Sequence, residues 1–189
     1  EIERNLPNGH TAIVAMIETT DALLQVRDIA TADKRIVALI LGSEDFSSSA
    51  GMIATPDTLR SATQQIVFAA RAAGKTPLGF AGSITQFSDR EKFLEMIKEA
   101  RDLGFEGSFC IHPLQVEVCN EGFAPTKEEV EEAHKMIKCY EEALSSARGA
   151  ITFKGKMIDE PVVERARQLI KKHERIKMAT NYGTSQGAQ

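Results

Sequence analysis

Short apolar runs alternate with amphipathic segments from residue 13 to residue 121. Unbroken apolar runs of this length are typical of strands covered on both faces, and helical spacing of apolar residues indicates helices between them. We expect strands at residues 13–17, 35–41, 76–82 and 107–113. We expect helices at residues 19–32, 55–75, 88–105 and 113–121. This alternation predicts an α/β fold with a parallel sheet covered by helices.

The rest of the chain does not continue the strand–helix alternation. Two amphipathic helices are predicted at residues 127–147 and 161–179, and a glycine-bearing connector at 148–160 is expected to be extended. The end of the chain is polar and rich in small residues, which is typical of disorder. The predicted divisions are therefore 1–125, a helical extension at 126–175 and a disordered tail at 176–189.

Composition and charge narrow the possible partners and the cellular compartment. The chain has 189 residues and a net charge of −4, with basic residues spread among acidic ones, so we expect no nucleic-acid partner. Three cysteines without a CxxC pair indicate a reducing compartment, and no apolar run suggests a membrane span, so a cytoplasmic protein is predicted. The chain does not begin with methionine, which suggests a fragment or a processed chain.

Two acidic residues follow consecutive predicted strands. Glu18 comes directly after the first strand, and Asp45 follows the second after a glycine. Carboxyl ends of neighbouring parallel strands share one edge of a sheet, where ligands of α/β folds bind. The two carboxylates together would suit Mg²⁺, although each could instead cap a helix or a turn. Glu44 is interpreted as a solvated or salt-bridged neighbour of Asp45.

Other polar residues at the same end have less specific interpretations. His112, in "CIHP", could be an acid/base, a ligand or a substrate hydrogen-bond donor, or it could be structural. The serines at 47–49 lack a phosphate-binding pattern and are interpreted as a flexible loop. The cysteines are interpreted as core or surface thiols, with Cys110 inside a strand.

Several stretches together resemble one enzyme family. They are "AMIETTDAL", "LILGSEDF", "LRSATQQIVFAARAAGK", "ARDLGFEGSFCIHPLQVEVCNEGFAPTKEEVEEA" and "FKGKMIDEPVVERA". They resemble the citrate lyase β-subunit-like lyases of the HpcH/HpaI aldolase superfamily, which include malyl-CoA and citramalyl-CoA lyases. The resemblance implies a (β/α)₈ barrel of TIM type, of which this chain would supply the C-terminal half, strands 5–8, plus a helical extension.

The resemblance also implies roles for individual residues. Glu18 and Asp45 would be the Mg²⁺ ligands, and Asp159, in "GKMIDEP", would be an acid/base that reaches a neighbouring subunit's site on an arm. Asp159 also precedes Pro161 at a position suited to a helix N-cap. His112, Gly42 and Ser43 would line the substrate pocket. A homo-oligomer, trimer or hexamer, follows from the same resemblance.

The activity implied is Mg²⁺-dependent cleavage of a β-hydroxyacyl thioester of citryl, malyl or citramalyl type to an acetyl-type thioester and a 2-oxo acid. The acyl group would be carried by coenzyme A or an acyl-carrier protein. One alternative is a non-catalytic or truncated member that binds an acyl thioester or builds an oligomer, and another is a phosphoenolpyruvate-type Mg²⁺ enzyme. One stretch, "TPLGFAGSITQFSD", departs from many relatives, which carry an aspartate after the corresponding strand.

Overall fold

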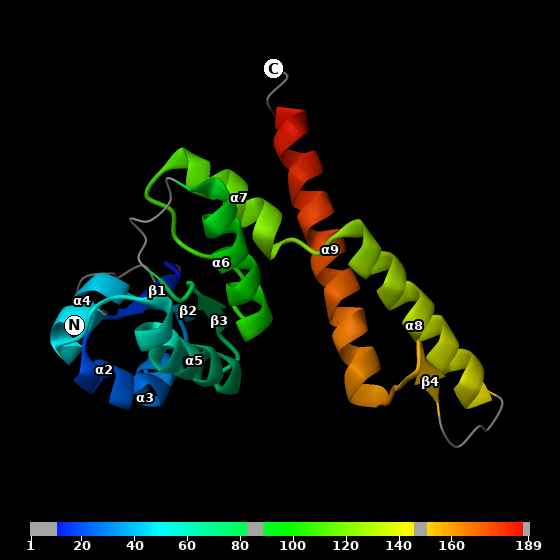
Figure 1. Cartoon of the computed structure of the whole chain (residues 1–189), viewed down its shortest axis with the longest axis horizontal. Coiled ribbons are helices and arrows are strands. Elements are labelled where there is room, and N and C mark those ends of the chain that lie inside the picture. Colours follow the sequence, from blue (N-terminus) through cyan, green and yellow to red (C-terminus); the bar gives the residue numbers. More distant parts are fainter. Residues whose placement is uncertain (1–10, 83–88, 146–150, 187–189) are drawn as a thin grey trace. The chain divides into compact units, whose positions relative to one another are not determined.

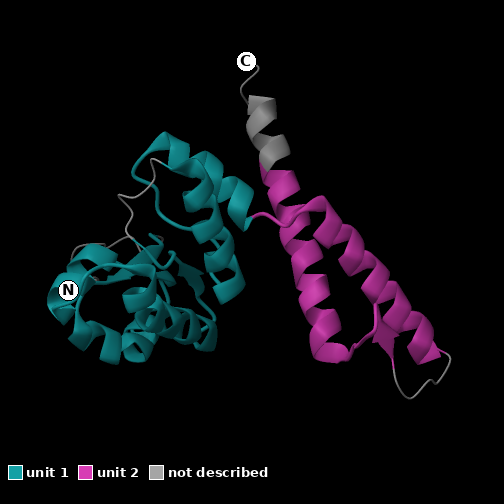
Figure 2. Cartoon of the chain, viewed as in Figure 1, with its two compact units in different colours: residues 1–123 teal, residues 124–189 magenta. Residues whose placement is uncertain are grey.

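The computed structural model describes residues 11–82, 89–145 and 151–186, with side chains as far as residue 179. The chain divides into two compact units, residues 1–123 (unit 1) and 124–189 (unit 2), which are coloured separately in Figure 2. None of the helices in the described ranges is long and apolar enough to cross a membrane.

Three parallel strands form the centre of unit 1 (Figure 1). They are β1 (Ile13–Ile17), β2 (Ile36–Leu41) and β3 (Thr76–Leu78), hydrogen-bonded in the order β1-β2-β3. Ile17 pairs with Leu41, and Ile40 pairs with Leu78. The carboxyl ends of the three strands therefore lie at one edge of the sheet, as the alternating pattern predicted.

Six helices accompany these strands in the described part of unit 1. They are α2 (Thr20–Leu24), α3 (Val26–Thr31), α4 (Ser43–Ala50), α5 (Pro56–Ala72), α6 (Arg90–Leu103) and α7 (Pro113–Phe123). Thr55 begins α5 with a capping box, followed by a proline in the first turn. The helix predicted at 19–32 is divided in two at Gln25.

The core of unit 1 joins the sheet to the helices. Leu39 in β2 and Leu59 and Ile66 in α5 are completely buried. Beyond them, Phe80 and Phe93 pack edge to face with ring centroids 5.6 Å apart. The helices α3 and α5 pack against the strands. This packing holds in place the strand ends that precede Glu18 and Asp45.

The prediction of a fourth strand at residues 107–113 is wrong. Among the described residues this segment makes one isolated parallel bridge, between Leu78 and Gly107. Further along, the backbone N–H groups of Ile111 and His112 donate to Oε1 of Gln115, at 2.7 and 3.1 Å. A side chain thus satisfies amides that a fourth strand would have paired in the ladder. β3 is also shorter than predicted, because Gly79 leaves the strand with a φ of +127°.

The serine run, predicted as a flexible loop, is helical. Residues 43–50 form α4, which ends at Gly51 in the left-handed conformation with a φ of +66°. Phe46 and Ser47 face inward and are buried. Serine favours a helix only weakly, so its propensity does not account for α4. The packing of Phe46 and Ser47 against the core stabilises the helix instead.

Unit 2 is a helical hairpin with a small β-hairpin at its turn. Its elements are α8 (Lys127–Ser145), β4 (Thr152–Phe153), β5 (Lys156–Met157) and α9 (Glu160–Gln186). Tyr140, Ile158 and Val163 form the centre of a separate hydrophobic cluster.

One prediction for unit 2 is wrong. The connector at 148–160 is not extended throughout, because Lys154 and Gly155 form a turn with positive φ and fold the chain into the antiparallel pair β4–β5. α9 ends at Gln186, within the segment 176–189 for which disorder is predicted, and residues 187–189 lie outside the described part.

Candidate functional site

Glu18 and Asp45 lie where β1 and β2 end. Glu18 immediately follows the last residue of β1, and Asp45 lies in the first turn of α4, which begins two residues after β2. The backbone N–H of Gly42 donates to the carbonyl of Ile17 at 2.9 Å and so ties the two strand ends together. Both acids therefore leave neighbouring strands at the same edge, as their sequence positions predicted.

A pocket of about 200 Å³ opens at this edge. It is lined by residues from all three strand ends, from the start of α4 and from the segment after Gly107. The lining residues are Met16, Glu18, Ile40, Leu41, Gly42, Ser43, Glu44, Asp45, Gly79, Phe80, Gly82, Ser108 and Phe109. Carboxylates and apolar side chains therefore share one pocket, and no Lys, Arg or His lines it among the described residues.

Gly42 makes room for the Glu18 side chain. A Cβ atom built on Gly42 would lie 2.6 Å from Cγ of Glu18 and 2.9 Å from its Oε1. Real Cβ atoms essentially never approach other atoms so closely. The φ of Gly42 is −82°, which any L-residue adopts, so space rather than backbone conformation requires glycine here.

The donor set fits Mg²⁺. Glu18 is half-buried and Asp45 is exposed, so both carboxylates are accessible to a metal ion from the solvent. Magnesium binds through one or two carboxylates and keeps its remaining positions for water and substrate oxygen. The described residues hold no cluster of three or more acidic, histidine or cysteine side chains that could enclose a metal ion. Glu18, Glu44 and Asp45 are the carboxylates that line the pocket among the described residues, and Mg²⁺ needs only one or two carboxylates.

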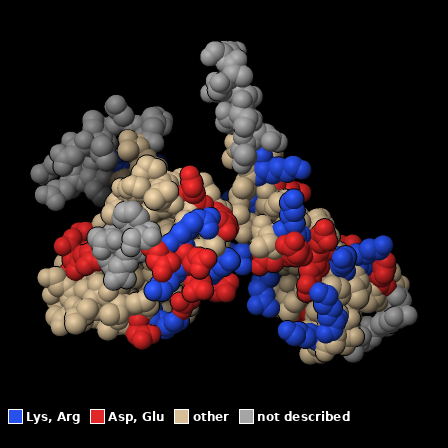
Figure 3. All heavy atoms as spheres, turned by 45° about the horizontal axis from the view of Figure 1, so that its top comes forward, with Lys and Arg blue, Asp and Glu red and all other residues tan. Residues whose placement is uncertain are grey.

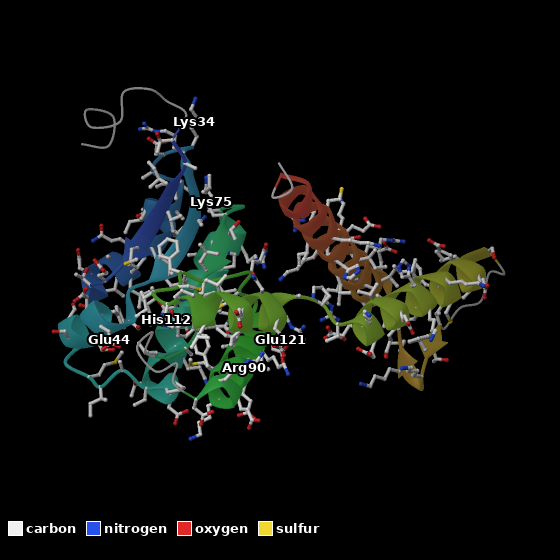
Figure 4. The ribbon with its side chains drawn as sticks, turned by 90° about the horizontal axis from the view of Figure 1, so that it is seen from above. Lys34, Glu44, Lys75, Arg90, His112 and Glu121 are labelled. Carbon is white, nitrogen blue, oxygen red and sulfur yellow. The ribbon has the colours of Figure 1, made fainter. Side chains whose placement is uncertain are left out.

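Glu44 lies closer to the site than the sequence indicated. Its sequence position suggests a solvated or salt-bridged neighbour of Asp45, and Glu44 is indeed exposed, but it also lines the pocket. Figure 4 shows Glu44 at the end of unit 1 where the strands finish, whereas Lys34 and Lys75, which precede β2 and β3, lie toward the opposite end.

His112 does not line the pocket. Its Nδ1 accepts a hydrogen bond from the backbone N–H of Leu114 at 3.2 Å, in the first turn of α7. The backbone N–H of His112 donates to Oε1 of Gln115. These contacts favour the structural interpretation of His112, as a residue that shapes the start of α7.

Several pocket residues were not predicted from the sequence. Met16 and Phe80 supply apolar wall, and Ser108 and Phe109 come from the segment that was expected to be a strand. Met16 is two residues before Glu18, so the period of a strand places both on one face of β1. That signal could have identified Met16, whereas Phe109 depends on a loop path that no local pattern specifies.

Asp159 lies in unit 2, at the junction of the β-hairpin and α9. Its Oδ1 accepts from the backbone N–H of Val162 at 3.2 Å, so the predicted N-cap geometry is present. Next to it, Glu160 pairs with Arg167 at 2.7 Å, and hydrogen bonds from Arg167 and Tyr140 lower the pKa of the Glu160 carboxyl. Asp159 itself is exposed.

Charged side chains are mixed over the surfaces of both units. In Figure 3, blue Lys and Arg spheres lie among red Asp and Glu spheres on the face shown. Ion pairs account for part of this mixing, for example Arg90 with Glu121 at 2.5 Å in unit 1 and Lys154 with Glu132 at 2.6 Å in unit 2. In unit 1, Arg60 also pairs with Glu99, and Arg71 pairs with Glu106.

Residues 1–113 match the model of the HpcH/HpaI aldolase/citrate lyase family. The chain belongs to this family. The match confirms the resemblance inferred from the motifs, and the family fold is an α/β fold of TIM-barrel type.

Relatives within the HpcH/HpaI family match most of the chain. A citrate lyase subunit beta from Leuconostoc mesenteroides subsp. cremoris is 35% identical over 90% of this chain and 57% of its own length. A (3S)-malyl-CoA thioesterase from Cereibacter sphaeroides is 33% identical over 86% of this chain and 56% of its own length. The chain thus spans little more than half the length of these relatives.

Solved structures show the same likeness. The protein CitE of Mycobacterium tuberculosis, crystallised with magnesium, acetoacetate and coenzyme A, matches 86% of this chain and 61% of its own with a TM-score of 0.72 and 27% identity. A citrate lyase from Burkholderia xenovorans matches 92% of this chain and 56% of its own, with a TM-score of 0.72 and 26% identity.

Proposed function

We propose that this chain carries the metal-binding half of a Mg²⁺-dependent carbon–carbon lyase that cleaves a β-hydroxyacyl thioester. One observation supports this most: Glu18 and Asp45, predicted from matched strand ends, line a single pocket at the carboxyl edge of the sheet. The relatives named citrate lyase subunit beta, and the CitE structure with magnesium and coenzyme A, support the same chemistry.

In this proposal Glu18 and Asp45 hold the ion. Bound there, Mg²⁺ would supply Lewis-acid polarisation of substrate oxygens. Gly42 leaves space for the Glu18 carboxylate, and the backbone at Gly42 and Ser43 lies beside it in the pocket wall. Met16, Phe80 and Phe109 provide the apolar surface that limits water around the reacting atoms.

The proposed substrate is a citryl-, malyl- or citramalyl-type thioester. Cleavage gives an acetyl-type thioester and a 2-oxo acid, with coenzyme A or a carrier protein bearing the acyl group. The pocket is acidic, and its described wall has no basic side chain to neutralise a substrate carboxylate. The substrate's negative charge is therefore proposed to be met by the metal and by residues outside the described pocket wall.

Asp159 is proposed as the general acid/base, acting in the site of a neighbouring subunit of a homo-oligomer, a trimer or hexamer. It would protonate the thioester enolate on cleavage, or take the methyl proton in the reverse direction. Its exposure at the tip where the β-hairpin meets α9 supports this role, because a group serving another chain must be accessible. His112, which lies outside the pocket wall, is assigned to the structure of α7.

The test of the metal site compares an acid in the pocket wall with an acid outside it. Asp45→Asn removes one proposed ligand at constant shape, and we expect Mg²⁺ affinity, measured by calorimetry, to fall at least tenfold and thioester cleavage to be lost. Asp28→Asn removes the same charge on the exposed side of α3, outside the pocket wall, and is expected to keep both within about twofold. Equal losses in both variants, or unchanged affinity in Asp45→Asn, would contradict the assignment of Asp45.

A second candidate function follows from the length of the match. The chain spans 57% of its citrate lyase relative, and its sheet holds three strands and one bridge in the described residues. It would then supply the C-terminal half, strands 5–8, of the barrel and act as an acyl-thioester-binding or oligomer-building subunit. Binding of Mg²⁺ and a malyl-type thioester without turnover by the chain would favour this candidate, and turnover would exclude it.

A further inference from the structure

Cys110 and Cys119 lie in contact in unit 1, although they are nine positions apart in the sequence. Their Sγ atoms are 3.8 Å apart, and neither forms a disulfide. A disulfide bond requires a separation of about 2.05 Å, so closing the pair needs a relative movement of about 1.7 Å. Cysteine side chains cover such a distance by small rotations when one of them lies outside regular structure.

The two cysteines stand on supports of different mobility. Cys119 lies on α7 and belongs to the hydrophobic core of unit 1. Cys110 lies in the irregular segment between the bridge at Gly107 and the start of α7, and it packs against the same core. The Cys119 thiol, which is fixed on a helix, therefore contacts the Cys110 thiol, whose backbone belongs to no helix or strand.

Gln115 keeps this segment against α7. Its side chain is 1% exposed, and its Oε1 accepts the N–H groups of Ile111 and His112. These two bonds attach the residues immediately after Cys110 to the helix that carries Cys119. The buried Gln115 side chain therefore fixes the path of the backbone directly after Cys110. This keeps the Cys110 sulfur close to that of Cys119.

We propose that Cys110 and Cys119 form a reversible dithiol/disulfide site that responds to peroxides. This site is separate from the carboxylate pocket and does not depend on the proposed lyase function. The oxidant is a hydroperoxide, and the reductant that restores the site is a thiol.

The exposures of the two thiols set the order of events. Cys110 is half-buried and Cys119 is 7% exposed, so peroxide reaches Cys110 first. Burial, and then the neighbouring Cys110, raise the pKa of the Cys119 thiol to about 12, so Cys119 is a neutral thiol at neutral pH.

The Cys110 sulfur attacks a peroxide oxygen, the O–O bond breaks, and Cys110 becomes a sulfenic acid while the other oxygen leaves as water or an alcohol. The Cys119 sulfur then attacks the Cys110 sulfur and breaks the S–O bond. The hydroxide that leaves takes the Cys119 proton as water. Two thiols are oxidised by two electrons, and one peroxide is reduced.

Closing this bond would alter the pocket wall. Ser108 and Phe109, which line the pocket, directly precede Cys110. A covalent link from residue 110 to α7 anchors this wall to the core. Oxidation is therefore expected to slow amide hydrogen exchange at residues 108–112, and reduction to restore it.

The experiment uses hydrogen peroxide on the full chain, with free thiols counted before and after. Of the three cysteines, we expect one reactive thiol, Cys139, to remain in the oxidised protein after denaturation, and three after treatment with dithiothreitol. Cleavage after Glu106, Glu117 and Glu121 separates the two cysteines, so mass spectrometry should find the peptides 107–117 and 118–121 linked and two hydrogens lighter than their sum.

Variants distinguish this site from general oxidation. Cys139→Ser is the matched control and should form the same linked peptides, while Cys119→Ser should leave Cys110 as a sulfinic acid or a mixed disulfide. The proposal is overturned if wild-type Cys110 and Cys119 are both alkylated after peroxide treatment, if the link joins two chains, or if exchange at 108–112 is the same in both redox states.

Discussion

Single residues at the carboxyl edge of the sheet carry the proposed chemistry. Glu18 and Asp45 could be selected from the sequence because one acid after each of two consecutive apolar runs places both at one edge. Their surroundings could not be selected in this way. The Cβ space at Gly42, the position of Glu44 in the wall and the contact between Cys110 and Cys119 all depend on distances between segments remote in sequence.

Gly42→Ala tests the steric requirement at this scale. The φ of −82° accepts alanine, so the fold should be retained, but the new Cβ displaces the Glu18 side chain. We expect a Mg²⁺ affinity about tenfold lower, equivalent to about 1.4 kcal/mol, measured by calorimetry.

Gly107→Ala is the control for this substitution. A Cβ atom on Gly107 would meet Leu78 at 3.6 Å, an ordinary contact, and Gly107 does not line the pocket. Its Mg²⁺ affinity should equal that of the wild type. Wild-type affinity in Gly42→Ala would show that the position of Glu18 does not control metal binding.

At the scale of elements, periodicity located the strands and the long helices well. It failed where long-range contacts override local preference. The serine run became α4 because Phe46 and Ser47 are buried, and the predicted strand at 107–113 became a loop because Gln115 accepts its amides. The extended connector became a hairpin through the turn at Lys154 and Gly155.

The entry into β2 provides a pH-dependent prediction. Hydrogen bonds from the side chain and then the backbone of Arg35 lower the pKa of Asp33 from 3.8 to about 2. Because the folded-state pKa is depressed, the ionised form stabilises the fold above about pH 4, and this contribution is lost as the pH falls toward 2. Asp33→Asn should therefore be less stable than the wild type at pH 7, with the difference shrinking below pH 4.

Urea unfolding at several pH values measures this difference. Asp28→Asn, on the exposed side of α3, is the control and should follow the wild type at neutral pH. A stability difference between Asp33→Asn and the wild type that stays constant from pH 7 to pH 3 would mean that the ion pair with Arg35 does not contribute through ionisation.

At the scale of the whole molecule, two units each have their own core. The core of unit 1 is centred on β2, α5 and α6, and that of unit 2 on Tyr140, Ile158 and Val163. The family match covers residues 1–113 and so falls on unit 1. The carboxylate pocket belongs to unit 1 and Asp159 to unit 2, which is why the proposed acid/base role requires an assembly to be tested.

Val163→Ala tests whether the core of unit 2 opens by itself. Val163 is completely buried, so the loss of two methyl groups should destabilise unit 2 by about 2 kcal/mol. Native-state hydrogen exchange should show faster exchange in α8 and α9 and unchanged exchange in β1 and β2.

Met178→Ala on the same helix is the control, since Met178 is 64% exposed and its loss leaves no cavity. It should leave exchange in α8 unchanged. Faster exchange in β1 and β2 of Val163→Ala would show that both cores unfold as one cooperative unit.

The sequence by itself determined the α/β class, the parallel strand ends that carry Glu18 and Asp45, and the family. These features follow from hydrophobic periodicity and from motifs, which are local along the chain. Only the tertiary structure decided which wall residues surround the two acids, that Gly42 gives Glu18 its space, that residues 107–112 form a loop bound to α7, and that Cys110 meets Cys119. These features depend on how separate segments pack, because burial and hydrogen-bond satisfaction are settled between elements rather than within them.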